Sequence, residues 1–299
     1  MANRLFATLK ESVAKFVADD AMSLSASIAY YAAFALAPLL LIAVSFAGIF
    51  FGEEAVTGAL DAELQSTMGP ASAKFLQELV AASNSKSDNL LMSLVGLALL
   101  LIGASALFGQ LQAALNKVWR VESPRAVGWK GFIRGRYLSF SMVLVTGFLL
   151  LASMLLTTFT QMLADRVGHL SGLPVAGWIA GSGILSLAVT ILLFAAIFKI
   201  LPDAHTRWSD VWLGAAFTAV LFMFGKLGIG WYLGRAAAAS TYGSAGSFVV
   251  LLMWLYYSSI ILLFGAVFTE VNSRARFGNN VKLPQEPQPP PDRSNTAPG

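Results

Sequence analysis

Few side chains in this sequence could do hydrolytic chemistry, and they are widely separated. The chain has two histidines, His169 and His205, and no cysteine, which excludes a thiolate nucleophile and a cysteine-ligated metal. Phosphodiester hydrolysis usually needs clustered carboxylates or histidines that hold a divalent cation. The sequence has no DxD, HExxH, P-loop or GxSxG pattern, and the adjacent Asp19 and Asp20 diverge on a helix. We therefore expect no enzyme, no catalytic residue, no metal site and no cofactor.

Two ionisable residues lie within or at the end of long apolar stretches, where a polar group must find a partner or water. Lys226 either extends its amine to the outer interface or faces a substrate cavity. Glu270 either forms a structural clamp with Lys199, Arg134 or Arg136, or carries protons or binds a cation. Their predicted depths differ, so we do not expect Lys226 and Glu270 to pair.

Further candidates for a substrate path are a proline and four hydroxyl-bearing residues. Pro38 should kink the first apolar helix, and the freed carbonyls either line a cavity or bond to a neighbouring helix. Tyr30 and Tyr31 are either interfacial aromatics or hydroxyl donors to a polar pocket. Tyr242 and Ser244 belong to a Tyr-Gly-Ser-x-Gly turn, which predicts a loop at the mouth of the helix bundle.

The elements that must position these residues are membrane helices. Apolar residues make up 57% of the chain and charged residues 12%, against about 45–50% and about 25% in soluble domains. A helix of about 20 apolar residues crosses the hydrocarbon core. Six stretches satisfy this: roughly residues 27–51, 90–111, 137–162, 178–200, 211–232 and 247–269. The sequence therefore predicts an all-α polytopic membrane protein with a six-helix transmembrane domain over residues 27–272.

Charge placement predicts the orientation of these helices. Most of the 20 Lys and Arg residues lie in the N-terminal arm, the second and fourth loops and the C-terminal tail. The positive-inside rule therefore places both termini in the cytoplasm. The basic second loop, residues 117–136, suits anionic lipid headgroups better than RNA, because its aromatic residues do not form an interleaved stacking platform.

Three segments flank or interrupt the predicted spans. Residues 1–26 have the pattern of an amphipathic helix, which either lies at the membrane interface or packs against a cytosolic partner. Its apolar stripe is Leu5, Phe6, Leu9, Val13, Phe16 and Val17, with Arg4, Lys10, Glu11 and Lys15 opposite. The acidic outer loop, residues 52–89, predicts two short helices on the outer membrane surface. The Pro-rich tail, residues 273–299, should be cytoplasmic and disordered.

Several motifs occur together in an order that resembles one known family. They are Ser25-Ala26-Ser27-Ile28-Ala29-Tyr30-Tyr31, Ala114-Leu115-Asn116-Lys117-Val118-Trp119, Leu213-Gly214-Ala215-Ala216, Tyr242-Gly243-Ser244, and Trp254-Leu255-Tyr256-Tyr257 followed by Gly265-Ala266. Over about residues 15–272 the chain resembles the YihY/BrkB family, formerly labelled ribonuclease BN. The resemblance implies a multi-pass protein of the bacterial inner membrane and adds Asn116 and Tyr257 to the candidate positions. The usual acidic residue after Gly-Ala is replaced by Val267, with Glu270 three positions on.

Three functions follow from the residues and the resemblance. Few buried charges would replace the hydration shell of an ion, so we expect a transporter of a lipid-like or amphipathic envelope substrate. The alternative is a non-transporting envelope-integrity, virulence or serum-resistance factor, and a tRNA-processing nuclease fits least. The expected partners are the bilayer, anionic lipid headgroups at the cytoplasmic face, a lipid-like substrate and, as an open alternative, a second copy of the chain. Nucleic acid is not expected.

Overall fold

The computed structural model describes residues 2–51, 57–58, 60–61, 64–65, 73–78, 103, 106–121, 175–204, 206–238 and 243–277. Regular structure in these ranges is helical, with no strand, which confirms the all-α prediction for this part of the chain. The long helices are α1 (Ala2–Ala18), α2 (Ala21–Phe51), α7 (Val175–Ile200), α8 (Trp208–Ala238) and α9 (Gly243–Phe277). A further helix covers residues 106–118.

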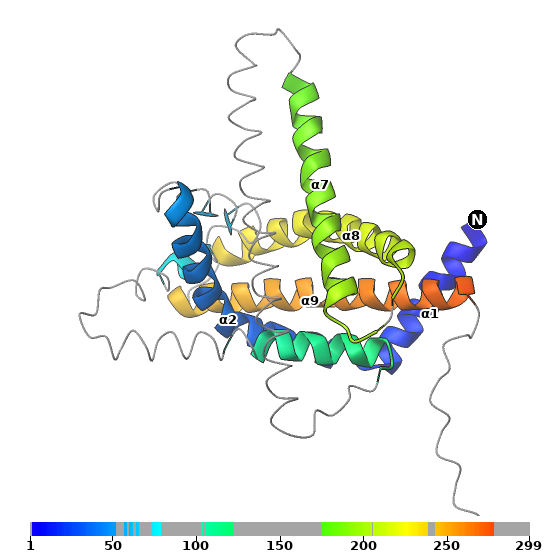
Figure 1. The fold of residues 1–299 in the computed structure, drawn as a ribbon. Helices are drawn as coiled ribbons and strands as arrows, with labels where there is room; N and C mark the ends of the chain where they lie inside the picture. Colours follow the sequence, from blue (N-terminus) through cyan, green and yellow to red (C-terminus); the bar gives the residue numbers. More distant parts are fainter. Residues whose placement is uncertain are drawn as a thin grey trace, which may run out of the picture.

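Three of the other long helices pack on α9. Helix α9 contacts α8, α2 and α1, while α7 packs against α8 (Figure 1). Two segments, Trp208–Lys226 of α8 and Gly246–Ala275 of α9, are long and apolar enough to cross a membrane. Shorter apolar stretches, Ala21–Leu36 and Ser186–Ile200, lie in α2 and α7. These four helices coincide with predicted spans.

The other two predicted spans, 90–111 and 137–162, lie mostly outside the described residues, as does the tail after Phe277. The six-span topology therefore stays a prediction. The outer-loop helices differ from expectation where they are described. Leu64 and Leu76 are buried in one cluster with Leu251 and Leu255 of α9, so these side chains pack on the bundle.

Two residues, Asp19 and Asp20, separate the amphipathic helix α1 from α2, which contains the first predicted span. Asp20 has a positive φ of 53°, and its N–H donates to the Val17 carbonyl at 3.1 Å, which ends α1. The Asp20 carboxylate then accepts a hydrogen bond from the Ser23 hydroxyl at 2.9 Å in the first turn of α2. Asp is one of the few residues that tolerates this backbone conformation.

Reciprocal glycine and threonine contacts hold α8 against α9. Gly214 of α8 lies against the Thr269 side chain, and a Cβ at that glycine would overlap the threonine. Gly265 of α9 lies in the same way against Thr218 of α8. Each threonine hydroxyl donates at 2.7 Å to a carbonyl of its own helix, Thr218 to Gly214 and Thr269 to Gly265. The hydroxyls are thus satisfied within each helix while the two backbones approach closely.

Candidate functional site

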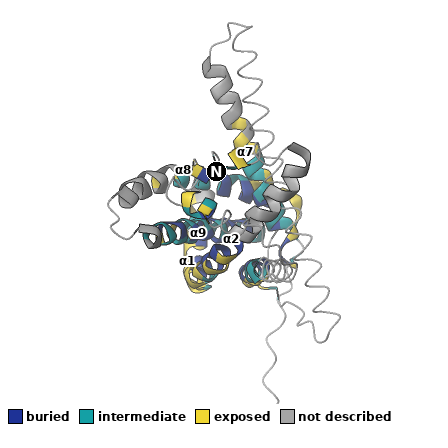
Figure 2. Cartoon of the chain, turned by 90° about the vertical axis from the view of Figure 1, so that its left-hand side faces the viewer, coloured by how far each residue is buried: buried dark blue, intermediate teal, exposed yellow. Residues whose placement is uncertain are grey.

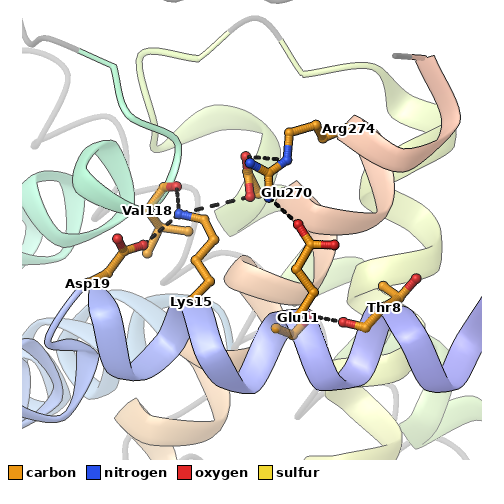
Figure 3. Close-up of polar contacts among 8 residues, drawn as sticks. Thr8, Glu11, Lys15, Asp19, Val118, Glu270 and Arg274 are labelled. Atoms are coloured by element: carbon orange, nitrogen blue, oxygen red, sulfur yellow. Dashed lines mark hydrogen bonds and ion pairs between the residues drawn. The ribbon is translucent and has the colours of Figure 1, made fainter. Parts of the chain in front are cut away.

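Five charged side chains join α1 to the C-terminal turns of α9. We call them the α1–α9 charge cluster: Glu11, Lys15, Asp19, Glu270 and Arg274. The α1 members are spaced four residues apart, as are the two α9 members, so each set lies on one side of its helix. Figure 3 shows the two sets facing each other.

Lys15 is the buried centre of this cluster, although the sequence placed it with Arg4, Lys10 and Glu11 opposite the apolar stripe of α1. Its Nζ lies 2.5 Å from Asp19 Oδ2 and 3.9 Å from Glu270 Oε2. It also donates to the Val118 carbonyl at 2.9 Å. Val118 ends the helix over residues 106–118, where free carbonyls carry partial negative charge, so the ammonium also caps that helix. Lys15 therefore ties three segments together.

Arg274 completes the cluster at its more exposed edge. Its Nη2 donates to Glu11 Oε1 at 2.7 Å, and its Nε lies 3.8 Å from Glu270 Oε1. Glu270 thus lies between two cations, while its buried Oε2 accepts no hydrogen bond from the described residues. An ion pair without hydrogen bonds leaves this carboxylate incompletely solvated.

The predicted clamp role of Glu270 agrees with this geometry, but the predicted partner Lys199 is wrong. The Lys199 ammonium donates to the Thr206 carbonyl and lies 5.7 Å from the centre of the Trp208 ring. It is held at the turn between α7 and α8 because these acceptors are nearer. Arg134 and Arg136 lie outside the described residues.

Asn116 joins the helix over residues 106–118 to the turn after α7. Its Nδ2 donates to Asp203 Oδ2 at 2.8 Å, and its Oδ1 accepts from the Asp203 backbone N–H at 2.9 Å. Gln112 adds longer contacts of 3.3 Å to both Asp203 oxygens. Asn116 is buried, so this reciprocal pairing satisfies its amide and fixes the turn. The geometry gives Asn116 a structural role.

Asp210 is a buried carboxylate that sequence reasoning missed. It lies in the first turn of α8, where the partial positive charge of the helix end favours a carboxylate. Its Oδ2 accepts from the Ser273 hydroxyl of α9 at 3.0 Å, while Oδ1 is buried without a hydrogen-bond partner among the described residues. The Trp-Ser-Asp sequence at a helix start was the available signal.

Lys226 and Glu270 are not brought together, as predicted. Lys226 is half-buried in α8. The preceding Gly225 lies against the Tyr257 hydroxyl, and a Cβ at Gly225 would overlap that ring. Tyr257 of α9 thus fills a notch in α8 beside Lys226.

Tyr30 and Tyr31 are the candidates of α2 whose side chains the structure describes, and both lie on the surface of that helix. Tyr30 and Tyr31 are exposed on α2, and Tyr30 makes edge-to-face contacts with Tyr31 and Phe34. This exposure favours the interfacial or lipid-facing interpretation over hydroxyl donation to an interior pocket. α2 continues as a helix through Pro38, and Ser244 lies in the first turn of α9. Tyr242 lies outside the described residues.

The cluster pairs carboxylates with cations at the end of the bundle and is suited to holding α1 in place. In the described ranges no three His, Asp or Glu side chains converge as a metal site would require. The charged groups can therefore clamp the helix ends or meet the headgroup of an amphipathic molecule.

Comparison with known proteins gives one family. The family described as Virulence factor BrkB matches residues 12–290. A UPF0761 membrane protein of Pseudomonas aeruginosa is 26% identical over 273 residues, which cover 91% of this chain and 64% of that protein. A UPF0761 membrane protein of Methylibium petroleiphilum is 28% identical over 264 residues, covering 87% and 61%. The chain thus spans under two-thirds of the length of these relatives. No solved structure matches it.

Proposed function

Because this chain belongs to the Virulence factor BrkB family, whose relatives are named membrane proteins, we propose that it moves a lipid-like or amphipathic envelope substrate. We place it in the bacterial inner membrane as a multi-pass protein with both termini in the cytoplasm, and we propose no catalytic reaction. The observation that carries the proposal is the placement of charge on α9. Residues 243–269 contain no charged residue, and Glu270 and Arg274 follow directly in the charge cluster.

An amphipathic molecule suits this distribution better than a hydrated ion does. An ion crossing the apolar length of the bundle would need polar groups to replace its water shell. α2 has no charged residue over Ala21–Phe51, and α7 has only Lys199 at its end. A lipid tail, in contrast, gains from the apolar surfaces of these helices, and its headgroup would meet the charged end.

The test is reconstitution of the full chain in liposomes with fluorescent phospholipid analogues and with small polar solutes. The proposal expects movement of the lipid analogue between leaflets above the rate in protein-free liposomes, with no entry of the polar solutes. A lipid rate equal to that of empty liposomes for every headgroup tried would count against it.

A static role in envelope integrity is the second candidate, and the α8–α9 contact favours it. The reciprocal glycine and threonine packing leaves little freedom for these helices to separate. The two functions differ in one requirement: a transporter that opens at this end must separate α1 from α9 at the charge cluster, whereas a static protein need not. Since the chain has no cysteine and the Glu11 and Arg274 side chains meet only at their ends, Glu11→Cys and Arg274→Cys can be joined by a reducible bis-methanethiosulfonate crosslinker, which locks α1 to α9.

The lock separates the two functions when flux and cell growth are both measured. A transporter that opens at this end loses lipid movement when it is crosslinked and regains it when a reductant cleaves the crosslinker. A static envelope protein restores the detergent resistance of a deletion strain equally well locked or reduced. Each single-cysteine variant is the matched control, because it removes the same ion pair without forming the crosslink.

A further inference from the structure

The exposed side of α1 carries a row of apolar side chains next to the exposed Lys10, and its buried side includes polar side chains. Phe6, Val13 and Val17 are 73%, 54% and 70% exposed, whereas Ser12 and Lys15 are buried. In Figure 2 the exposed side of α1 faces away from α9. A helix on a soluble domain has the opposite arrangement, with its apolar stripe on the core. Part of the predicted stripe does turn inward, since Phe16 meets Phe264 of α9 edge to face.

The contacts of α1 fix its level relative to the membrane. It is paired with Glu270 and Arg274, the first charged residues that follow the uncharged stretch of α9. Residues at such a boundary lie where the apolar core of the bilayer gives way to headgroups. α1 therefore lies at this boundary and is neither inside the core nor in bulk water.

The exposed apolar row of α1 continues onto the first turns of α2. Met22, Tyr30 and Phe34 are exposed at helical spacing along α2, directly after the turn at Asp20. These residues belong to an uncharged helix of membrane length. The exposed rows thus adjoin the surface that α2 presents to lipid.

We propose that α1 is an interfacial membrane helix whose exposed apolar row contacts the phospholipid bilayer. Its charged side packs on the protein, which is the reverse of a helix on the surface of a soluble domain. Phe6, Val13 and Val17 insert at the boundary between headgroups and acyl chains, and the charge cluster anchors the opposite side to α9. Apolar area leaving water stabilises this position by about 25 cal/mol per Å². The inference does not depend on transport, because a static membrane protein would hold α1 in the same way.

The test uses the absence of native cysteine. Val13→Cys and Val17→Cys each carry a nitroxide label on the apolar row. Ala14→Cys and Ala18→Cys are the matched controls, because each lies one residue further along the helix and is also exposed. Each full-length variant is placed in phosphatidylcholine liposomes containing some phosphatidylglycerol. Collision with oxygen, which concentrates in lipid, is compared with collision with a water-soluble nickel chelate.

The expected result is several-fold higher oxygen-to-nickel accessibility at positions 13 and 17 than at 14 and 18. Equal nickel accessibility at all four positions would overturn the proposal, because the row would then face water. Immobile labels at 13 and 17 that neither reagent reaches would also overturn it, because another protein surface would then cover the row. Soluble monodisperse behaviour in detergent before reconstitution shows that each variant has folded.

Discussion

Lys15 is the residue on which the position of α1 most depends. Its ammonium is enclosed by Asp19, the Val118 carbonyl and Glu270, with 5% of the side chain exposed. A buried cation of this kind is tolerated only because it has several acceptors. The same contacts explain why removal of the lysine should be costly, since Asp19 and Glu270 would each lose a neighbouring positive charge.

We predict that Lys15→Met destabilises the protein by about 3 kcal/mol, the usual cost of leaving buried partners uncompensated. The measurement is the unfolding midpoint of purified protein in detergent. Lys10→Met is the matched control, because Lys10 is exposed on the same helix and its loss should change the midpoint little. Similar midpoints for the two variants would show that the cluster does not stabilise α1.

Asn116 gives a second prediction at the residue scale. Asn116→Ala removes both hydrogen bonds to Asp203 and should cost about 1–2 kcal/mol, because a backbone N–H and a carboxylate oxygen lose their partner. Gln112→Ala removes only contacts of 3.3 Å to the same carboxylate, so it should cost less than half as much. Proteolysis of the turn after α7 provides an independent readout. Equal losses in the two variants would contradict the reciprocal pairing.

The sequence indicated which charged residues need a partner, but it did not indicate which residues those partners are. Glu270 was predicted either to form a clamp or to carry protons or bind a cation, because a carboxylate at the end of an apolar stretch needs a partner. Its partner Lys15 lies far away in the sequence, and nothing local indicates that α1 crosses the end of α9. The spacing of Glu11, Lys15 and Asp19 matched that of Glu270 and Arg274, but such spacing is also common on solvent-exposed helices.

At the scale of elements, α8 and α9 form one antiparallel unit. The contacts pair residues in reverse order: Asp210 with Ser273, Gly214 with Thr269, Thr218 with Gly265, and Gly225 with Tyr257. A constant register over this length means that side chains on one helix fill notches on the other.

We predict that Gly265→Ala destabilises this unit by about 2 kcal/mol, because the new methyl group overlaps Thr218 and the helices must move apart. Gly228→Ala on α8 is the control. It meets open space, so its helix propensity should leave the protein unchanged or more stable by up to about 1 kcal/mol. Thermal unfolding in detergent measures both variants.

The double variant Gly265→Ala with Thr218→Ala identifies the cause. It should recover part of the stability lost in Gly265→Ala, since the smaller side chain at 218 makes room for the methyl group. Losses that simply add would contradict direct contact between these positions. The sequence did not reveal this packing of glycine against threonine. A glycine four residues before another small residue is common in apolar helices, and the sequence does not show which face of the helix meets a partner.

At the scale of the whole molecule, composition alone predicted a helical membrane protein, because apolar content and run length depend on no tertiary contact. The predicted spans at 27–51, 178–200, 211–232 and 247–269 all fall within helices that are longer than predicted. The difference arises because hydropathy locates the apolar part of a helix, whereas caps such as Asp20 determine where the helix ends. The inward turn of Leu64 and Leu76 could not be predicted, since a surface helix and a packed helix share the same periodicity.

The predicted even number of spans requires both ends of the chain on one side of the membrane. Fusions of a fluorescent protein and of alkaline phosphatase to each end test this prediction in cells. We expect fluorescence and no phosphatase activity at both ends, because the phosphatase is active only outside the cytoplasm. Opposite results at the two ends would exclude six spans, and the charge placement would need another explanation.

The turn at Asp20 has a mechanical consequence. α2 contains 31 residues, or about 46 Å of helix, which exceeds a hydrocarbon core of about 30 Å. A helix of this length accommodates a thinner or thicker bilayer by changing its tilt. Because only Asp19 and Asp20 separate the two helices, a change in the tilt of α2 would also move the adjoining end of α1. Membrane thickness would thereby strain or relax the ion pairs between α1 and α9.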